Sequence, residues 1–277
     1  MEPKFIDILG QRMGYRESDG QGPELFFVHG NSQSGETFFN QLEGPLGRRF
    51  HLFAMDLSGH GASGSPMDVV SQCSFPGHRE AIVQMAQALL SGPTLFVGHS
   101  LGGHLLIESS PRLEHMAGLL VFGTPPLALP PRLDLAFCAD GAVTTRIFSG
   151  SLHPDEIKDW ASRQFWKQNS DAITLVERMI LETHPMARPT LGKSAEKGDF
   201  VDEMKILKSL SVPLAILHGE HDALINGDYF KGLSFPTLWN DAVTILRDVG
   251  HCPHLEDPET FDGIIVQFAR HCGLFTP

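Results

Sequence analysis

Short runs of consecutive apolar residues, each closed by glycine or by a polar turn, recur in the first half of the chain and near its end. They lie at Leu25–Val28, His51–Met55, Thr94–Val97, Gly118–Phe122, Val212–Leu217 and Val243–Leu246. A strand with one solvated face alternates apolar and polar residues, whereas an unbroken apolar run is typical of a strand buried on both faces. The runs therefore predict the strands of a buried, mostly parallel sheet.

Segments with helical spacing lie between or after these runs. Their apolar residues form stripes at Phe38, Phe39, Leu42 and Leu46, at Ile82, Met85, Leu89 and Leu90, and at Phe261, Ile264, Ile265, Phe268 and Ala269. Strands that alternate with amphipathic helices are typical of βαβ units. The pattern predicts an α/β fold with a parallel sheet flanked by helices.

The middle of the chain lacks strand signals. From Pro125 to about Ser209, a proline-rich segment leads into helical stripes, at Ile157, Trp160, Ala161 and Phe165 and at Ile173, Val176, Ile180 and Leu181. We interpret residues 126–209 as a helical insertion in a core formed by residues 1–125 and 210–277. Insertions at the carboxyl edge of a parallel sheet usually border the ligand crevice, so we expect a cap over the site; a purely structural helical layer is the alternative.

Composition narrows the class of protein. The 277 residues are 42% hydrophobic and 19% charged, which supports a large core and excludes a disordered chain. With 21 Lys and Arg against 33 Asp and Glu, the net charge is −12, and no basic cluster is present, so nucleic acid and anionic membranes are poor partners. No apolar run reaches the ~18 residues of a membrane span.

Compartment is predicted from two further features. The first 20 residues mix charged with apolar side chains, which does not match an export signal. The four cysteines lie far apart and form no CxxC pair, so neither a disulfide framework nor a zinc knuckle is indicated. We expect a cytoplasmic protein, monomeric or weakly dimeric.

One motif points to a nucleophile. Gly98-His99-Ser100-Leu101-Gly102 follows the apolar run that ends at Val97 and precedes a predicted helix from Gly103 to about Pro111. A G-x-S-x-G sequence between a strand and a helix forms a tight turn that exposes the serine hydroxyl above the sheet. We therefore predict that Ser100 is a nucleophile; an inert turn serine is the alternative.

A serine nucleophile needs a base, which should follow a later strand. The loop after the last apolar run is Arg247–His251, in which Gly250 permits a close approach. We predict His251 as the general base. His254, which follows in the same segment, is expected to pack beside the site.

The carboxylate that orients this base should come before it in the chain. The loop that follows the run ending at Leu217 contains Asp222, which is our first choice, and Glu220 is the second. Asp248 and Asp228 stay open. The other possible location, Phe122–Pro126, contains no carboxylate and is excluded.

Backbone amides should hold the negative oxygen that develops during acyl transfer. The N–H of Leu101, at the start of the helix, is one predicted donor. The N–H of Asn31, in the loop His29–Ser32, is the second. A plain turn capped by the Asn31 side chain is the alternative.

We expect no cofactor and no metal. The glycine-rich segment Asp56–Gly64 lacks the Gly-Lys-Ser/Thr ending of a phosphate loop, so we interpret it as a structural loop. Among the 14 histidines, the group formed by His218, His221 and Asp222 comes nearest to a ligand cluster, but its spacing matches no known metal motif.

Taken together, the serine turn, HGN at 29–31, DLSGHGASG at 56–64 and GHCPHLEDP at 250–258 resemble the α/β-hydrolase superfamily. The resemblance implies an eight-stranded, mostly parallel sheet with helices on both faces and a cap inserted after the sixth strand. It also implies Ser100, Asp222 and His251 as nucleophile, acid and base, without a cofactor. An aspartate nucleophile would have indicated an epoxide hydrolase or dehalogenase.

Within that superfamily, HGNSQSGETFFNQLEG, GHSLGGH, FGTPP and SFPTLWNDA are similar to the N-acyl homoserine lactone hydrolases. This implies opening of the lactone ring of bacterial quorum-sensing signals. Two features depart from that group: the cap segment matches weakly, and Asp222 stands where glutamate is expected. A general carboxylesterase and a noncatalytic hydrolase-like binding protein are the alternatives, and carbon–carbon bond hydrolases and perhydrolases share the motifs.

The small-molecule ester or lactone substrate needs an apolar pocket. We expect Gly30 of the first loop at its entrance and the aromatic residues of the insertion around the acyl chain, namely Phe137, Phe148, Trp160, Phe165 and Trp166. The Trp160 indole could donate its N–H to a substrate carbonyl. The alternative for each aromatic residue is that it packs the cap onto the core.

Overall fold

The computed structural model describes residues 1–138 and 146–276, and these residues contain one eight-stranded sheet in the order β1-β2-β4-β3-β5-β6-β7-β8. The strands are β1 Lys4–Ile8, β2 Gln11–Glu17, β3 Glu24–Val28, β4 His51–Met55, β5 Thr94–His99, β6 Met116–Phe122, β7 Leu214–Gly219 and β8 Thr244–Leu246. β2 pairs antiparallel with β1 and β4, and every other pairing is parallel. The predicted α/β class with a mostly parallel sheet is confirmed.

The antiparallel hairpin of β1 and β2 was not predicted from the apolar pattern. β1 lies at the edge of the sheet and is mostly exposed, so it lacks the unbroken apolar run of a buried strand. The turn between the strands places Leu9 and Gly10 at positive φ, 56° and 70°. Edge strands of this kind carry a weak sequence signal because only one side of each packs on the core.

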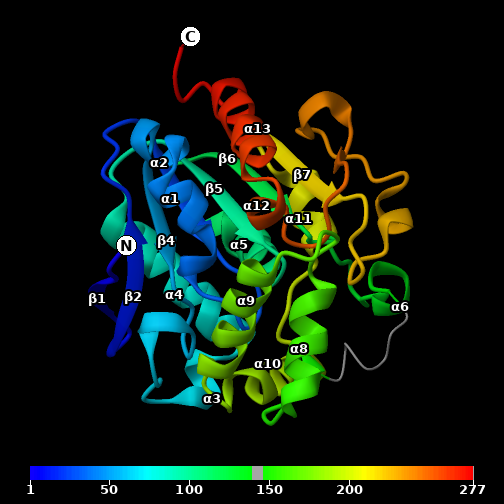
Figure 1. The fold of residues 1–277 in the computed structure, drawn as a ribbon. Coiled ribbons are helices and arrows are strands. Elements are labelled where there is room, and N and C mark those ends of the chain that lie inside the picture. The colour runs from blue at the N-terminus through cyan, green and yellow to red at the C-terminus, as the bar shows by residue number, and fades with distance from the viewer. Residues whose placement is uncertain (139–145, 277) are drawn as a thin grey trace.

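Helices cover both faces of the sheet (Figure 1). They are α1 Phe39–Glu43, α2 Pro45–Arg49, α3 Val69–Gln72, α4 Phe75–Leu89, α5 Leu101–Ser109, α6 Leu133–Ala136, α8 Pro154–Arg163, α9 Ser170–Glu182, α10 Ala187–Glu196, α11 Glu203–Ser209, α12 Pro253–Glu256 and α13 Pro258–His271. Neighbouring strand residues serve different faces: Phe26 packs with the cluster of α4, α5 and α11, and Phe27 with that of α1, α2 and α13. Side chains that alternate across a strand explain this division.

The strand register brings the functional loops to one edge. Val28 pairs with Gly98 on β5, and His99 pairs with Phe122 on β6. Because the strands run parallel, their carboxyl ends and the loops that follow them meet at this edge. The loops after β3, β5, β6 and β7 are therefore neighbours.

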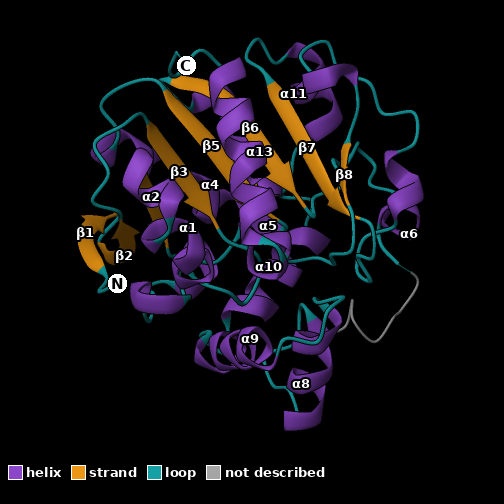
Figure 2. Cartoon of the chain, turned by 45° about the horizontal axis from the view of Figure 1, so that its top comes forward, coloured by secondary structure: helices purple, strands orange, loops and turns teal. Residues whose placement is uncertain are grey.

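In the described residues between β6 and β7, the helices that follow the short α6 fall into two parts. α8 and α9 pack on each other through an apolar cluster that includes Trp160, Ala161 and Val176, and Cys252 and Leu255 join it from the segment around α12. Figure 2 shows this pair beyond the arrowhead ends of the central strands. α10 and α11 instead contribute Leu191 and Leu207 to the main core. We call α8 and α9, with the loop between them, the cap helices.

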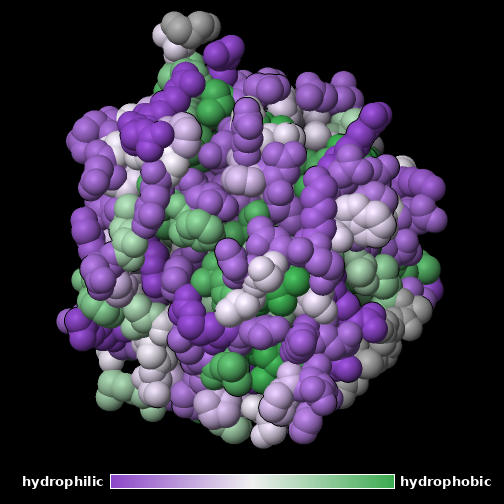
Figure 3. Space-filling view, viewed as in Figure 1, coloured by the Kyte–Doolittle hydropathy of each residue, from purple (hydrophilic) through white to green (hydrophobic). Residues whose placement is uncertain are grey.

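The outer surface differs from the interior. The face drawn in Figure 3 is mainly hydrophilic, with apolar residues exposed in small separate patches. Within the described part of the chain, no helix combines the length and the hydropathy that crossing a bilayer requires.

Candidate active site

Ser100 occupies a strained turn between β5 and α5. Its backbone lies at φ 50° and ψ −118°, a conformation that non-glycine residues rarely adopt and that is often found at functional sites. The flanking glycines are required by space: a Cβ on Gly98 would lie 2.6 Å from the Gly103 Cα, and one on Gly102 would lie 2.3 Å from the Val28 oxygen. The sequence therefore forms the sharp turn predicted for a nucleophile.

His251 and Asp222 form a buried pair. The Nδ1 of His251 lies 2.7 Å from Oδ2 of Asp222. A carboxylate accepts, so Nδ1 carries the proton and Nε2 of the neutral imidazole keeps its lone pair. The other oxygen of Asp222 accepts the backbone N–H groups of Leu224 and Ile225 at 2.8 and 3.1 Å.

The same contacts determine the charge of the acid. Burial acts to raise the pKa of Asp222, but the charge and hydrogen bond of His251 and the backbone N–H of Leu224 outweigh it, so the pKa is lowered. Asp222 thus stays ionised and can stabilise an imidazolium.

The other candidate acids lie elsewhere. Glu220 is exposed and accepts the Asp248 N–H at 3.3 Å, while Asp248 itself is exposed. Asp228 pairs with Lys231 at 2.6 Å on the surface. Of the four carboxylates weighed from the sequence, Asp222 is the one that the structure brings to His251.

Ser100 and His251 line one pocket. Room for the imidazole comes from Gly123, at φ 58°, where a Cβ would lie 2.8 Å from Cε1 of His251. Among the described residues, the Ser100 hydroxyl forms no hydrogen bond. In unliganded acyl-transfer sites the hydrogen bond between the serine hydroxyl and the histidine is often long, and it tightens only when substrate binds.

His29 holds the first loop in place. Its Nε2 accepts the Leu57 N–H at 3.0 Å, and its Nδ1 donates to the Gly30 oxygen at 2.8 Å. Burial lowers the pKa of His29 to about 3, which agrees with the neutral ring that this pairing requires. The loop that carries Asn31 is therefore fixed by a side chain the sequence analysis did not single out.

The two predicted oxyanion donors lie at this edge of the pocket, since Asn31 and Leu101 both line it. In the described part of the chain, neither backbone N–H donates to a protein acceptor, and Leu101 stands at the first position of α5, where helix amides are unpaired. The Asn31 side chain donates to the Ile147 oxygen at 2.8 Å and accepts from the Ser32 hydroxyl at 3.1 Å, so it contacts both the insertion and its own turn.

A polar network links the loop of His251 to α8, and sequence reasoning missed it. The backbone oxygen of Gln164 accepts the His251 N–H at 2.9 Å, and its side-chain oxygen accepts from Gln33 at 3.0 Å. His99 lies between the two sides, with Nδ1 2.9 Å from Gln33 and Nε2 2.9 Å from the His251 oxygen. No motif marks Gln164, because its partners are distant in sequence.

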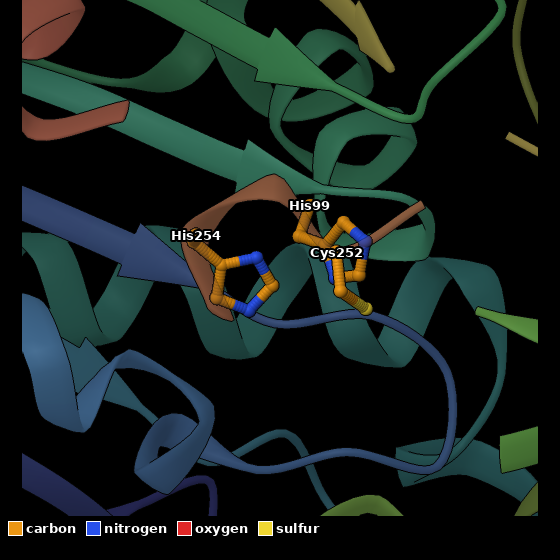
Figure 4. Close-up of side chains that lie close together, drawn as sticks. All are labelled: His99, Cys252 and His254. Atoms are coloured by element: carbon orange, nitrogen blue, oxygen red, sulfur yellow. The ribbon is translucent and has the colours of Figure 1, made fainter. Parts of the chain in front are cut away.

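A second group of side chains shares His99 with this network (Figure 4): His99 at the end of β5, and Cys252 and His254 from the segment around α12. Both ring nitrogens of His99 are engaged by the network, and burial raises the pKa of Cys252 well above its ordinary value, so the sulfur is a thiol. The Nε2 of His254 lies 2.9 Å from the Thr37 hydroxyl. These groups fit a hydrogen-bonded core better than a metal centre, which needs a thiolate and free nitrogens.

His221, which the sequence groups with His218 and Asp222, lies away from them. Its ring stacks on Trp166, with centroids 3.8 Å apart. Trp166 is 51% exposed and does not reach the pocket.

The pocket measures about 450 Å³ and has a mainly apolar wall. Of the substrate-binding residues expected from sequence, Gly30, Phe137, Phe148 and Trp160 line it. Phe165 does not; it follows the end of α8 and is 5% exposed within the apolar cluster of the cap helices. The stripe shared by Trp160 and Phe165 is thus divided, with the earlier residue reaching the pocket and the later one packing the cap.

With this fold and this geometry, the class of protein can be stated. Residues 25–263 match the alpha/beta hydrolase family, and the chain belongs to that family. The resemblance predicted from the sequence motifs is confirmed.

More particular similarities concern named relatives. The chain is 24% identical over 267 residues to the pimeloyl-[acyl-carrier protein] methyl ester esterase of Nitrosospira multiformis, covering 95% of this chain and all of that protein. The structure of the N-acyl homoserine lactonase AidH complexed with N-butanoyl homoserine superimposes with a TM-score of 0.91 at 26% identity, covering 100% of this chain and 99% of that one. A putative aryl esterase from Burkholderia cenocepacia, at 24% identity and a TM-score of 0.80, shares the fold and covers 98% and 99% of the two chains.

Proposed function

We propose that this protein is a serine hydrolase that cleaves a carboxylic ester or lactone through an acyl-enzyme. The observation that carries the proposal is the buried His251–Asp222 pair, 2.7 Å long, in the loops beside a strained Ser100 that lines the same pocket. Nucleophile, base and acid occur in the chain order that this fold uses. A noncatalytic binding protein would need none of these side chains to converge.

The reaction begins when the Ser100 oxygen attacks the substrate carbonyl and its proton passes to Nε2 of His251. The carbonyl oxygen becomes negative and is held by the N–H groups of Leu101 and Asn31. The carbon–oxygen bond to the leaving group then breaks, and the imidazolium, stabilised by Asp222, protonates that oxygen. In a lactone the leaving oxygen stays attached to the acyl part.

Water completes the cycle. His251 takes a proton from a water molecule, which attacks the acyl-enzyme carbonyl, and the intermediate releases the acid and restores Ser100. The net change is the addition of one water across the ester bond.

For the substrate, we propose an N-acyl homoserine lactone, whose hydrolysis would quench a quorum-sensing signal. The overall similarity to the lactonase AidH supports this, together with an apolar pocket large enough for an acyl chain. Trp160 lines the pocket, and its indole N–H makes no hydrogen bond with another described residue, so it could donate to the substrate amide. In this proposal the insertion between β6 and β7, of which Phe137, Phe148 and Trp160 line the pocket, selects the acyl chain.

A general carboxylesterase is the second candidate. Relatives of similar length are named as methyl ester esterases, and the apolar wall would accept a simple acyl chain equally well.

The deciding experiment is mass spectrometry of the products from a panel of N-acyl homoserine lactones and p-nitrophenyl esters, with Ser100→Ala as control. A gain of one water on the lactones that disappears in the variant would support the lactonase proposal. Turnover of esters alone would favour the carboxylesterase. An equal gain with Ser100→Ala would contradict the serine mechanism.

A further inference from the structure

A buried ion pair interrupts the apolar wall of the pocket. Nδ1 of His104 lies 2.9 and 3.1 Å from the two carboxylate oxygens of Glu203, and both residues line the pocket. Glu203 is fixed further because it accepts the Leu127 N–H at 2.7 Å. The hydrolytic mechanism makes no use of this pair.

The pair leaves one polar atom available. Because Nδ1 serves Glu203, the remaining donor position of the ring is Nε2, which bonds to no other described residue and is not among the fully enclosed unpaired atoms. Burial acts to lower the pKa of His104, but Glu203 and then Glu108 outweigh it, and the pKa is raised. A doubly protonated ring that donates from Nδ1 to Glu203 carries its second N–H on Nε2, the atom that this geometry leaves without a partner among the described residues.

The position of His104 fixes where this donor acts. It lies on α5 and its backbone N–H bonds to the Ser100 oxygen, so it stands one helical turn beyond the nucleophile. One turn advances about 6 Å along a helix. A group that meets His104 is therefore a few bonds away from the carbonyl that Ser100 attacks.

The charge around the donor selects the kind of group. Glu108 and Glu196 also line the pocket, and Arg79 binds Glu108 from outside it. Even with His104 charged, it and Arg79 face three carboxyl groups, so a further anion would be repelled. A neutral oxygen can accept the His104 N–H without this penalty.

We propose that His104 is a specificity-determining donor that binds a neutral oxygen, such as a keto carbonyl, on the acyl chain of the substrate. Glu203 is its positioning residue, since it holds the ring through Nδ1. This inference rests on the proposed serine hydrolase function and adds a substrate class to it: acyl chains that carry an oxygen in place of a plain methylene. An isolated buried donor would otherwise be left unpaired by a purely apolar chain, which disfavours that chain.

The test compares three p-nitrophenyl esters with seven-carbon acyl chains: heptanoate, 6-oxoheptanoate, and the mono-ester of heptanedioate, which ends in a carboxylate. We expect wild-type kcat/KM to be about tenfold higher for the oxo chain than for the plain chain, as for one hydrogen bond to a charged group. The carboxylate chain should be poorer than the oxo chain. A preference for the carboxylate would overturn the neutral-oxygen proposal.

Variants separate the donor from its surroundings. His104→Phe, which keeps the ring but not the donor, should lower the oxo-to-plain ratio about tenfold, and His104→Gln, which retains an N–H, should restore part of it. Glu203→Gln should lower the ratio less. Phe200→Leu alters the wall without changing a hydrogen bond and should leave the ratio unchanged. An unchanged ratio in folded His104→Phe would overturn the inference.

The outcome is distinguishable from failure of the proposed function. Ser100-dependent hydrolysis of plain heptanoate with a flat oxo-to-plain ratio would contradict the inference alone. If wild type hydrolyses none of the esters, the function fails. The donor is then tested by calorimetry of methyl 6-oxoheptanoate against methyl heptanoate on Ser100→Ala and on Ser100→Ala with His104→Phe. Equal binding of the two esters by both proteins would overturn the inference.

Discussion

The sheet core and the cap helices are built on different scales. The central strands are buried on both faces between two large apolar clusters, and Ser100 and Asp222 follow the ends of two of them, β5 and β7. The cap helices depend on a small cluster around Trp160 and Val176. The difference puts the proposed catalytic residues on a rigid frame, while the lighter cap helices add Trp160 and Gln164 to a pocket wall that comes mostly from other elements.

The border between the two regions is nevertheless hydrogen-bonded. Glu256 accepts the N–H groups of Gly250, Trp166 and Lys167 at 2.6, 2.8 and 2.9 Å. Gln164 adds its bond to the His251 N–H. The loop of the proposed base is thus held from the cap side as well as from the core.

Replacing the proposed nucleophile, which follows a core strand, should cause the greatest loss of activity. Ser100→Ala should reduce kcat/KM by at least about 10³-fold, because triad members act as a unit. Steady-state kinetics on the best ester or lactone measures the loss. Ser151→Ala, an exposed serine of the insertion, is the control and should retain wild-type rates. Activity in folded Ser100→Ala comparable to wild type would refute the assignment.

A smaller loss is expected when the acid is changed. Asp222→Asn removes the charge that stabilises the His251 imidazolium and should lower kcat about 10²- to 10⁴-fold. Glu220→Gln, an exposed carboxylate of the same loop, should change kcat by less than about twofold. If the two variants were equally impaired, the choice of acid would be wrong.

Two aromatic residues test whether the cap separates substrate choice from packing. Trp160→Phe should alter the acyl-length preference by about tenfold, since Trp160 lines the pocket. Phe165→Leu should cost about 1–1.5 kcal/mol of stability and leave the length profile unchanged, since Phe165 lies in the cap cluster. Kinetics across a series of chain lengths, with thermal unfolding, checks both. A shifted profile in Phe165→Leu would remove the distinction.

The border itself is tested at Gln164. Gln164→Leu leaves the Gln33 amide without its acceptor and should destabilise the protein by about 1–2 kcal/mol. It should also lower kcat a few-fold, because the side-chain oxygen that accepts from Cys252, next to His251, at 3.5 Å is lost, although the backbone oxygen that accepts the His251 N–H is kept. Gln168→Leu, on the exposed side of the cap, is the matched control and should do neither. Equal unfolding curves for wild type and Gln164→Leu would show that the network contributes nothing.

The smallest expected change is in protein stability, and it comes from a buried carboxyl group of the core. Burial raises the pKa of Asp262 to about 6, even though Gln41 donates to it. An acid whose folded pKa lies above its ordinary value loses stability as pH rises through that interval, and the loss is complete above the folded pKa. Asp262→Asn should therefore stabilise the protein by about 1 kcal/mol at pH 8, after allowance for partial exposure, and by only a small part of that at pH 4, just above the ordinary pKa.

Thermal unfolding at the two pH values checks this prediction. Glu259→Gln, on the same helix but exposed, is the control. Stabilisation that is equal at both pH values would exclude ionisation as its cause.

Much of the frame could be predicted because buried parallel strands have an unmistakable composition. The runs around Leu25, Thr94 and Leu214 became β3, β5 and β7. The β1–β2 hairpin could not be predicted in this way. Its first strand is exposed, and its turn depends on the positive φ of Leu9 and Gly10, which the pattern of apolar residues does not reveal.

The candidate site divides in the same way. Ser100 and His251 follow strands at fixed points, so chain order located them. The contact between His104 and Glu203 joins residues 99 positions apart, and either one alone resembles a surface side chain. Choosing between Glu220 and Asp222 requires the path of one loop, and separating Trp160 from Phe165 requires the direction of a helix axis. These are tertiary facts that periodicity does not contain.

Gly250 has a bearing on protein engineering. A Cβ at this position would lie 2.9 Å from the Trp166 nitrogen and 3.0 Å from the Gln164 oxygen, so no side chain fits here between the loop of His251 and the residues that follow α8. A chimera that receives its cap helices from another member of the family must therefore have compatible backbone both in the loop of His251 and in the residues that follow α8. Transplanting the helices alone would shift the imidazole along with them, and the hybrid would lose turnover before it ever displayed a new preference.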